Sequence, residues 1–236
     1  DPWRMLVAGR YRGNHLALHE EIVLLALEDR KGTFQWSMPA PVLGGAIFAD
    51  LLLNERIEIP DIDEKDPLID VVDDEPLGNP VLDEALERVA TANRRARLTH
   101  WVSRFGNKRG VPHEIARELC RRGILREDEQ SVLFFFRRRV FPEVNPVPER
   151  RLKARLEKAI FGEGTVDENT AVLIALANTA DVLKHAFEPQ RLKRRKKRIE
   201  RITEDQPVGK AAKHLVDTAV VALLTTVTTT SIVTSS

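Results

Sequence analysis

The segment from Asp167 to Phe187, DENTAVLIALANTADVLKHAF, restricts the fold more than any other part of the chain. Its first half is apolar almost all the way round a helix, whereas a surface helix has one apolar stripe and one polar face. A helix of this kind has to be enclosed by other helices. We therefore expect this segment to form the centre of a mostly helical fold.

Other segments have the spacing of amphipathic helices that would surround such a core. Leu18, Ile22 and Leu25 lie on one stripe, with charged residues in the first turn, and Gly32 is placed to end that helix. Asn79 followed by a proline predicts a second helix start. The same pattern recurs at Pro112 and Pro148, with stops at Gly123 and Gly162.

Residues 41–57 also have helical spacing, but they contain Gly44 and Gly45. Each glycine costs about 1 kcal/mol relative to alanine inside a helix. We expect close backbone packing or a frayed first turn at this point. After it, Ile57–Ile59 alternates like a short strand, and a second strand is expected at Leu68–Val72 within an acidic, proline-containing loop.

The length of 236 residues allows one large or two small globular domains with a proper core, and the balance of 42% hydrophobic to 31% charged residues is an ordinary globular one. The net charge of +1 hides a segregation of charge. Glu58–Glu75 is acidic, whereas 94–126, 137–139 and 191–201 are basic, so opposite faces are expected to carry opposite potentials. The single cysteine, Cys120, has the surroundings of a half-buried helix position and favours a reducing, cytoplasmic setting.

The two ends of the chain give weaker signals. Nothing resembles a secretory signal, although the opening DPWRMLVAGR has the look of a trimmed terminus. The threonine-rich tail from Thr218 has too few apolar residues for the roughly 20 that a spanning helix needs. We interpret it as a last core helix that frays, with membrane contact as the alternative.

The sequence SVLFFFRRRVF places phenylalanines directly against arginines, a combination that suits neither a core nor bulk water. A hairpin is predicted over about 124–141, with Ile124 and Leu125 entering the first strand, REDEQ as the turn and the aromatic run in the second. Its interfacial part comprises Val132, Leu133, Phe134, Phe135, Phe136, Arg137, Arg138 and Arg139. These residues either contact a membrane or partner, or the rings of Phe134 and Phe136 pack inward and only the arginines face water.

Catalytic and metal sites find no support in the sequence. FGNKRG lacks the Lys-Ser/Thr ending of a phosphate-binding loop, and no Gly-x-Ser-x-Gly elbow occurs. His19 and His113 each precede a glutamate, but neither has a second histidine one turn away, so both are expected to be polar residues at helix starts. We predict no enzyme activity, no cofactor and no metal.

Two further features allow more than one interpretation. The basic run Arg191–Arg201 contains Leu192 and Ile199 at near-helical spacing, which favours an amphipathic helix whose basic face is solvated, or contacts anionic membrane or nucleic acid. Trp101 precedes a glycine-flanked basic loop, and we expect its ring to lie in the core.

Several blocks in order, LALHEEIVLLALEDRKG, LGGAIFADLLLNERI, VLDEALERV, ARELCRRGILREDEQSVLFFF and ANTADVLKHAF, resemble the Golgi phosphoprotein 3 (GPP34) family over roughly residues 16–225. The resemblance is interpreted as that of a prokaryotic-type member. It implies one mostly helical domain over residues 1–236, with its core at about 16–225. In that domain amphipathic helices surround a central helix, and an apolar hairpin, matching Asp128–Arg139, lies on a basic membrane-facing surface. It also implies a peripheral membrane protein that binds phosphatidylinositol 4-phosphate and acts in sorting or retention of membrane proteins.

The resemblance also implies a headgroup pocket, which transfers in part. Trp36 lies near the family's tryptophan, with Gln35 at the ungapped position, and Arg109 matches one of its arginines. Gly44 and Pro112 stand where the family has arginines, so an anionic headgroup is the safer expectation. The predicted binding residues are Trp36, Lys108, Arg109 and Arg117, because guanidinium groups suit phosphate oxygens.

The expected partners are an anionic phospholipid membrane at the cytosolic face, at the Golgi only in a eukaryote, a protein cargo, and further copies of the chain through the hairpin. Ala17 replaces the family's capping hydroxyl, which predicts a helix start weakened by about 1 kcal/mol. The alternative function is a winged-helix-like nucleic-acid module. In that case the helix at Pro112–Arg122 would enter a groove and Arg137–Arg139 would grip phosphates.

Overall fold

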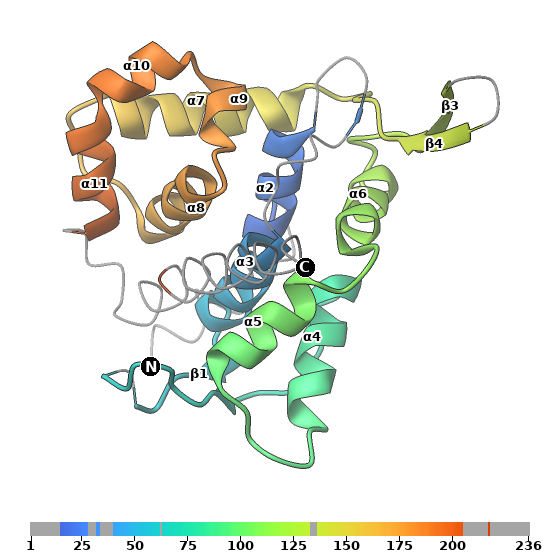
Figure 1. Ribbon diagram of the computed structural model, residues 1–236, viewed down its shortest axis with the longest axis vertical. Coiled ribbons are helices and arrows are strands. Elements are labelled where there is room, and N and C mark those ends of the chain that lie inside the picture. Colours follow the sequence, from blue (N-terminus) through green and yellow to red (C-terminus); the bar gives the residue numbers. More distant parts are fainter. Residues whose placement is uncertain are drawn as a thin grey trace, which may run out of the picture.

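The computed structural model describes residues 15–27, 32–33, 40–61, 63–132, 136–204 and 217. Over these residues helices dominate, accompanied by two antiparallel two-stranded sheets (Figure 1), so the predicted fold class is confirmed. The helices are α2 (Leu18–Ala26), α3 (Ala40–Leu53), α4 (Pro80–Ala90), α5 (Leu98–Gly106), α6 (Val111–Arg121), α7 (Val147–Phe161), α8 (Glu168–Thr179), α9 (Leu183–Ala186), α10 (Pro189–Arg194) and α11 (Lys196–Glu204), and the strands are β1 (Ile57–Glu58), β2 (Asp70–Val71), β3 (Asp128–Val132) and β4 (Phe136–Val140).

Helix α3 occupies the middle of the molecule, where it packs against α2, α4, α5, α8 and β1 (Figure 1). Residues 42–51 of this helix are all buried. Gly44 allows the close approach of α5, because a Cβ at this position would lie 2.0 Å from the carbonyl oxygen of Val102. Close backbone packing is therefore the reason for glycine at position 44.

Helices α2 and α8 are enclosed as well. Helix α8 is buried from Thr170 to Ala177, as its sequence predicts, but it lies to one side of α3, so the prediction that it forms the centre is wrong. All nine residues of α2 are buried, because α3, α6, α7, α8 and α9 surround it. Helix α2 is therefore not the amphipathic helix expected from its stripe, and it ends at Ala26 before Gly32 is reached.

A side chain from α3 caps the N-terminus of α2. Oδ1 of Asp50 accepts the Leu18 N–H at 2.9 Å, and Oδ2 accepts the His19 N–H at 3.1 Å. The Ala17 N–H donates to Oε2 of Glu20 at 2.9 Å. The acceptor that Ala17 lacks is thus supplied across the core, which offsets the expected weakening of this helix start.

Two buried carboxylates of α2 bind arginines from distant helices. Glu20 pairs with Arg122, just after α6, at 2.5 Å, and Glu21 pairs with Arg155 of α7 at 2.6 Å. Both glutamates were expected to be charges of a polar first turn, yet their side chains are almost completely inaccessible to solvent. These contacts between carboxyl groups and arginines hold the two helices that flank the hairpin against α2.

The lower end of the molecule contains β1, β2, α4 and α5. The side chain of Asn79 caps α4 as predicted, since it accepts the backbone N–H groups of Val81 and Leu82. Helix α5 has no counterpart among the predicted elements, although Trp101, Val102 and Phe105 share its buried face. Trp101 is only 4% exposed, which confirms the prediction of a core ring.

The basic run 191–201 forms two helices, α10 and α11, that meet at Arg195. Ile199 and Ile202 are buried, and Leu192 is partly buried against the core. The amphipathic interpretation of this run is confirmed, although the helix is broken. The tail from Thr218 lies outside the described residues.

Candidate functional site

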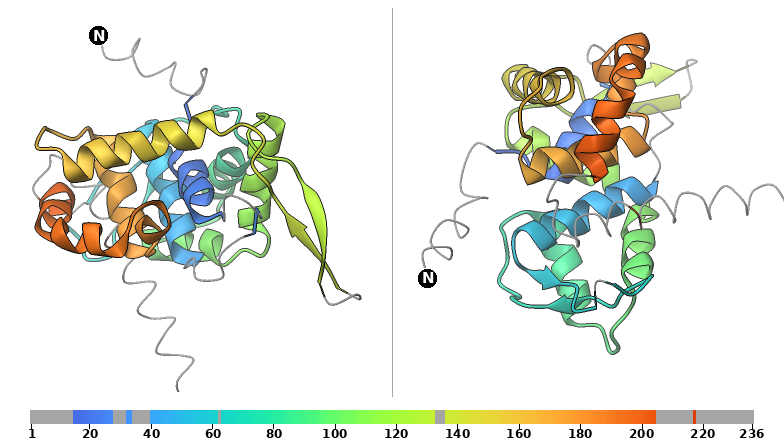
Figure 2. Two further views of the ribbon diagram at one scale, coloured as in Figure 1. Left: turned by 90° about the horizontal axis from the view of Figure 1, so that it is seen from above. Right: turned by 90° about the vertical axis from the view of Figure 1, so that its left-hand side faces the viewer.

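Strands β3 and β4 form a hairpin that projects from the helical body (Figures 1 and 2). Asp128 pairs with Val140 nearest the body, and Val132 pairs with Phe136 at the far end of the ladder. The span 128–139 implied by the family resemblance agrees with these strands. The prediction of REDEQ as the turn is wrong, because these residues lead into β3 and partly form it. Polar residues can form this strand because the two-stranded ribbon projects into solvent.

The hairpin is anchored where it leaves the body. Ile124, Leu125 and Phe141 are buried, and Leu125 forms a β-bridge with Glu143. The Gly32 carbonyl accepts the Phe141 N–H at 2.7 Å. A Cβ on Gly32 would lie 2.1 Å from the Phe141 carbonyl carbon, and the φ of Gly32 is +59°. Glycine is therefore needed here both for the close approach of the Phe141 backbone and for the left-handed conformation.

Charges of both signs line the described part of the hairpin. Arg137 pairs with Glu129 at 3.3 Å, and Arg139 lies 3.7 Å from Glu127. Arg138 is half-buried and also has an interaction partner. Because the Arg137 side chain is 80% exposed, its pair with Glu129 is weak and leaves the guanidinium accessible to another anion.

A histidine of α6 packs against the base of the hairpin. His113 stacks edge-on against the ring of Phe141, with the centroids 5.7 Å apart. Burial lowers the pKa of His113, and the charges of Arg117 and Arg139 lower it further. The charge of Glu127 acts in the opposite direction, so cations and anions both lie near this histidine.

The apolar residues predicted to contact a membrane fall largely outside the described part. Leu133, Phe134 and Phe135 are not described, and neither are the side chains of Val132 and Phe136. Whether these rings point outward or inward therefore stays a prediction from the sequence.

The predicted headgroup residues are held in different ways. Lys108 binds Glu84 at 2.5 Å and Glu114 at 3.1 Å, and these bonds raise the pKa of Lys108 against the lowering effect of its partial burial. Arg117 pairs with Glu127 at 3.3 Å. Arg109 is exposed and forms no ion pair within the described residues. Trp36 lies outside those residues.

Gly44 and Pro112, which stand at two arginine positions of the family pocket, both have structural roles here. Gly44 faces α5 in the core, and Pro112 lies in the first turn of α6. An arginine could not occupy position 44 without separating the two helices. The predicted cationic residues Lys108, Arg109 and Arg117 lie just before α6 or on it.

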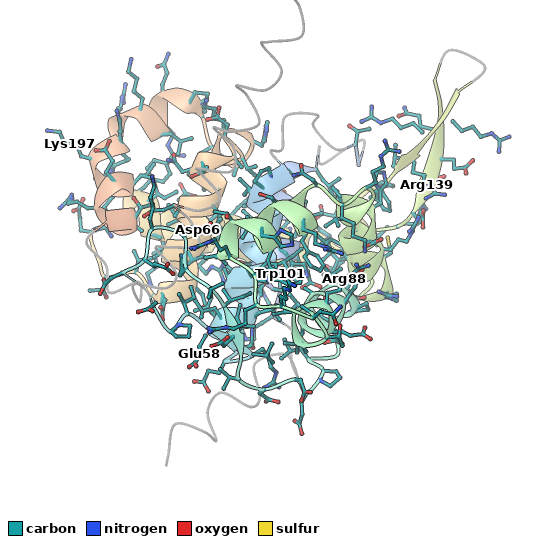
Figure 3. All side chains as sticks on the ribbon, turned by 60° about the horizontal axis from the view of Figure 1, so that its bottom comes forward. Glu58, Asp66, Arg88, Trp101, Arg139 and Lys197 are labelled. Carbon is teal, nitrogen blue, oxygen red and sulfur yellow. The ribbon has the colours of Figure 1, made fainter. Side chains whose placement is uncertain are left out.

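A second basic surface lies on α10 and α11. Arg191 and Arg195 are tied to Glu157 and Glu163, each at 3.0 Å. Lys193, Arg194, Lys197 and Arg201 are exposed and form no ion pair within the part of the chain described. In Figure 3, Lys197 and Arg139 lie at opposite ends of the upper side, with Glu58 below them.

The predicted separation of charge is partial. The acidic loop lies at the lower end, away from the hairpin and α10, but arginines from the segment predicted to be on the basic face cross to it. Arg95 binds Asp70 at 2.5 Å and Arg97 lies 3.5 Å from Glu64. Arg95 and Arg97 thus partly neutralise the acidic loop. They lie beside it because the connection between α4 and α5 returns to this end of the molecule.

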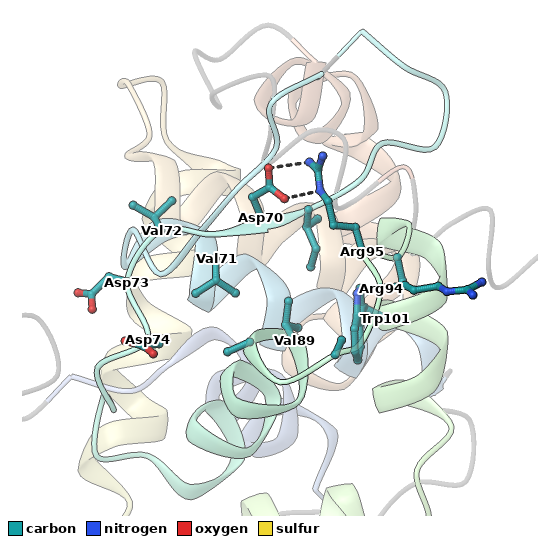
Figure 4. A pocket seen from close by; sticks show the side chains of 13 residues that line it. Asp70, Val71, Val72, Asp73, Asp74, Val89, Arg94, Arg95 and Trp101 are labelled. Atoms are coloured by element: carbon teal, nitrogen blue, oxygen red, sulfur yellow. Dashed lines mark hydrogen bonds and ion pairs between the residues drawn. The ribbon is translucent and has the colours of Figure 1, made fainter.

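A pocket of about 530 Å³ lies beside this loop, between β2 and the connection from α4 to α5 (Figure 4). Val71, Val89 and Trp101 line it, and the Asp70–Arg95 ion pair lies at its side. It is distant from the hairpin, so it is a separate feature of the surface.

Metal-binding and membrane-spanning features are absent within the described ranges. His, Cys, Asp and Glu side chains form no group of three or more there that would bind a metal ion. Within the same ranges, no helix combines the length and apolar character needed to cross a bilayer.

A helical body with an anchored, projecting hairpin and basic surfaces on one side is the arrangement that the family resemblance implies. The family model of Golgi phosphoprotein 3 (GPP34) matches residues 18–219, and the chain belongs to this family. Among curated proteins it is similar to the vacuolar protein sorting-associated protein 74 of Schizosaccharomyces pombe, with 23% identity over 234 residues, covering 84% of this chain and 68% of the yeast protein.

Proposed function

We propose that this protein binds the surface of anionic membranes through its hairpin and acts there as an adaptor in the sorting or retention of membrane proteins. The observation that carries the proposal is the anchored hairpin itself, which projects beyond the helices and bears exposed arginine at its described end. The sorting role rests on family membership and on the name of the yeast relative.

The energies involved suit reversible binding. Two phenylalanines inserted at the acyl boundary would contribute about 1.5 to 3 kcal/mol each. Each arginine near anionic lipid adds about 1 kcal/mol. Together these terms predict attachment that is reversible and weakened by salt.

Phosphatidylinositol 4-phosphate is the headgroup proposed from the family, with Lys108, Arg109 and Arg117 as its contacts and Trp36 beside them. Lys108 and Arg117 would have to exchange carboxylate partners for phosphate, whereas Arg109 has no ion pair to break among the described residues. Phosphate accepts such charge-assisted hydrogen bonds well. Arg109 is therefore the residue on which this finer proposal depends most.

Location and assembly are proposed in the same way. The protein would act at the cytosolic face of a membrane, at the Golgi in a eukaryote, and the hairpin would also serve as a contact between copies. The prokaryotic-type assignment stays a prediction from the sequence, and neither the family match nor the yeast relative supports it. We propose no catalytic activity.

The test is liposome co-sedimentation of the intact protein and of a variant with Phe134→Ser and Phe135→Ser. We expect the variant to lose at least tenfold in affinity for anionic vesicles, because both rings would leave the acyl boundary. Val72→Ser is the matched control, since Val72 is 57% exposed at the opposite end of the molecule. Unchanged binding of the double variant would refute membrane insertion by the hairpin.

Binding of duplex DNA by the intact protein and the double variant distinguishes the alternative function from membrane binding. A winged-helix-like module would bind duplex, and the two serine substitutions would hardly affect that binding. Within the described residues, however, Arg117, Arg121 and Arg122 on and after α6 are each paired with a glutamate. The helix proposed to enter a groove thus offers few free cations for phosphate contacts.

A further inference from the structure

A second pocket lies at the other end of the upper side, where α10 and α11 pass the end of α8 and α9. Its volume is about 500 Å³, within the range of about 300–1,000 Å³ that is usual for small-molecule sites. Leu183, Leu192 and Ile199 form its apolar lining. Leu183 and Ile199 are themselves buried and Leu192 is half-buried, so the three side chains form an apolar floor that is only partly accessible.

Three lysines stand around this apolar lining. Lys184 is bound to Asp181 at 2.6 Å, and Lys196 lies 3.7 Å from Glu200 in a loose pair between exposed side chains. Lys193 lines the pocket, is exposed, and forms no ion pair among the residues that the structure describes. An apolar lining beside such a cation is suited to a ligand with an apolar chain and an anionic head.

The surroundings of the pocket repeat this charge. Arg194, Lys197 and Arg201, on the same two helices, are exposed and unpaired within the described ranges. The hairpin and α10 both lie on the upper side of the molecule in Figure 1 and again in the right-hand view of Figure 2. One anionic surface could therefore be contacted at both ends.

We propose that this pocket binds a single anionic phospholipid, with an acyl chain against Leu183, Leu192 and Ile199 and the phosphate held by Lys193 and Lys196. The protein would thus have a second lipid contact in addition to the hairpin. The inference rests on the proposed function only for the orientation of both contacts toward one bilayer. An acidic peptide would satisfy the lysines but would leave the apolar lining uncovered, so a lipid is the better fit.

The experiment uses dihexanoyl phosphatidic acid as dissolved monomers, so that no bilayer is needed. Methyl NMR resonances of Leu192 and Ile199 in the full chain should shift and saturate at one lipid per protein. Dihexanoyl phosphatidylcholine should shift them much less, because its headgroup carries no net charge. Equal shifts with both lipids, no shifts, or the same effect from inorganic phosphate alone would overturn the proposal.

Matched charge reversals locate the site. Lys193→Glu should weaken binding of the phosphatidic acid about tenfold, because the attraction between the lysine and the phosphate is replaced by repulsion from a carboxylate. Arg194→Glu makes the same change on the same helix at a residue that does not line the pocket, and it should weaken binding less than about threefold. Equal weakening by both variants would show diffuse attraction and would overturn the pocket.

The hairpin variant separates this proposal from the proposed function. Phe134→Ser with Phe135→Ser should leave binding of dissolved phosphatidic acid unchanged, even where vesicle binding is lost. If vesicle binding proves independent of the hairpin while the pocket still binds phosphatidic acid, the proposed function fails and this inference stands. If the hairpin variant also abolishes binding of the dissolved lipid, the pocket assignment is wrong.

Discussion

Nδ1 of His19 lies 2.6 Å from Oδ2 of Asp50, and both side chains are buried where α2 begins beside α3. The same carboxylate caps α2, so Asp50 accepts hydrogen bonds from the helix terminus and also contacts the His19 ring. Burial alone would lower the pKa of His19, but the hydrogen bond and the charge of Asp50, with smaller contributions from the charge of Glu20 and from Asn79, leave this pKa raised. The start of α2 is thus a polar site within an apolar core.

Replacing Asp50 by alanine should destabilise the fold by about 2 to 4 kcal/mol. The change removes the acceptor of two backbone N–H groups and leaves His19 without its partner, and such losses cost about 0.5–2 and 1–3 kcal/mol respectively. Urea unfolding followed by circular dichroism measures the effect. Asp74→Ala, at an exposed carboxylate, is the control and should stay within about 0.5 kcal/mol. A similar small effect at Asp50 would contradict the capping role.

Glu21 should make the free energy of unfolding fall as pH rises. Burial raises the pKa of Glu21 to about 7 from 4.5, while Arg155 opposes the shift and Asp50 and Glu20 add to it. Between these values the unfolded chain has lost the proton that the folded chain retains. The contribution of Glu21 to stability is therefore full below about pH 4.5 and is lost progressively up to about pH 7, by roughly 3 kcal/mol.

Glu21→Gln tests this pH dependence, since glutamine resembles the protonated carboxyl and does not titrate. Unfolding free energies of both proteins would be measured from pH 5 to 8. The intact protein should show the steeper decline, to which the raised pKa of His19 contributes with the same sign in both proteins. Parallel curves would show that Glu21 does not titrate in this range.

Gly44→Ala should destabilise the protein by about 3 kcal/mol or more. The added methyl group would meet the backbone of α5 at 2.0 Å, and backbone cannot move aside as a side chain can. Gly164→Ala is the matched control, because nothing lies within 4 Å of a Cβ there. Thermal unfolding of both variants gives the comparison, and equal melting temperatures would rule out the tight contact between α3 and α5.

Gly32→Ala should loosen the base of the hairpin. Gly32 and Gly78 both have positive φ, of +59° and +79°, but only Gly32 has neighbouring backbone within contact distance of a Cβ. Gly78→Ala therefore measures the cost of the left-handed conformation alone, about 1 kcal/mol. Hydrogen exchange of the Phe141 amide, which donates to Gly32, should accelerate in the first variant only. Equal exchange in both would show that the hairpin does not depend on this contact.

Arg109→Glu should weaken binding to vesicles containing phosphatidylinositol 4-phosphate about tenfold relative to the intact protein. Arg109 is exposed and unpaired within the described residues, so its loss affects no internal ion pair there. Arg94→Glu makes the same charge change at the lower end and should have little effect. Equal weakening by both variants would indicate attraction by net charge without a headgroup site. A panel of other anionic lipids at equal charge density then tests headgroup specificity.

The sequence by itself determined those features that depend on neighbouring residues in the chain. Asn79 before Pro80, the prolines at 112 and 148, and glycines 123 and 162 mark helix boundaries through backbone geometry and local hydrogen bonds, and the structure has helices at these places. The ordered blocks from Leu16 to Phe187 likewise sufficed for the family, which the match over residues 18–219 confirms.

Only the tertiary structure decided which helix is central, where Glu20 and Glu21 lie, and what caps α2. Asp50 is 32 residues from Leu18, and Arg155 is 134 residues from Glu21, so no local pattern relates them. Helix α5 escaped prediction for a similar reason, because its short apolar face at Trp101 and Phe105 is specified by its packing on α3. From the local sequence, a glutamate in an apolar helix is expected to face solvent. An arginine that is distant in the chain can take the place of water as its partner, and the glutamate can then be buried.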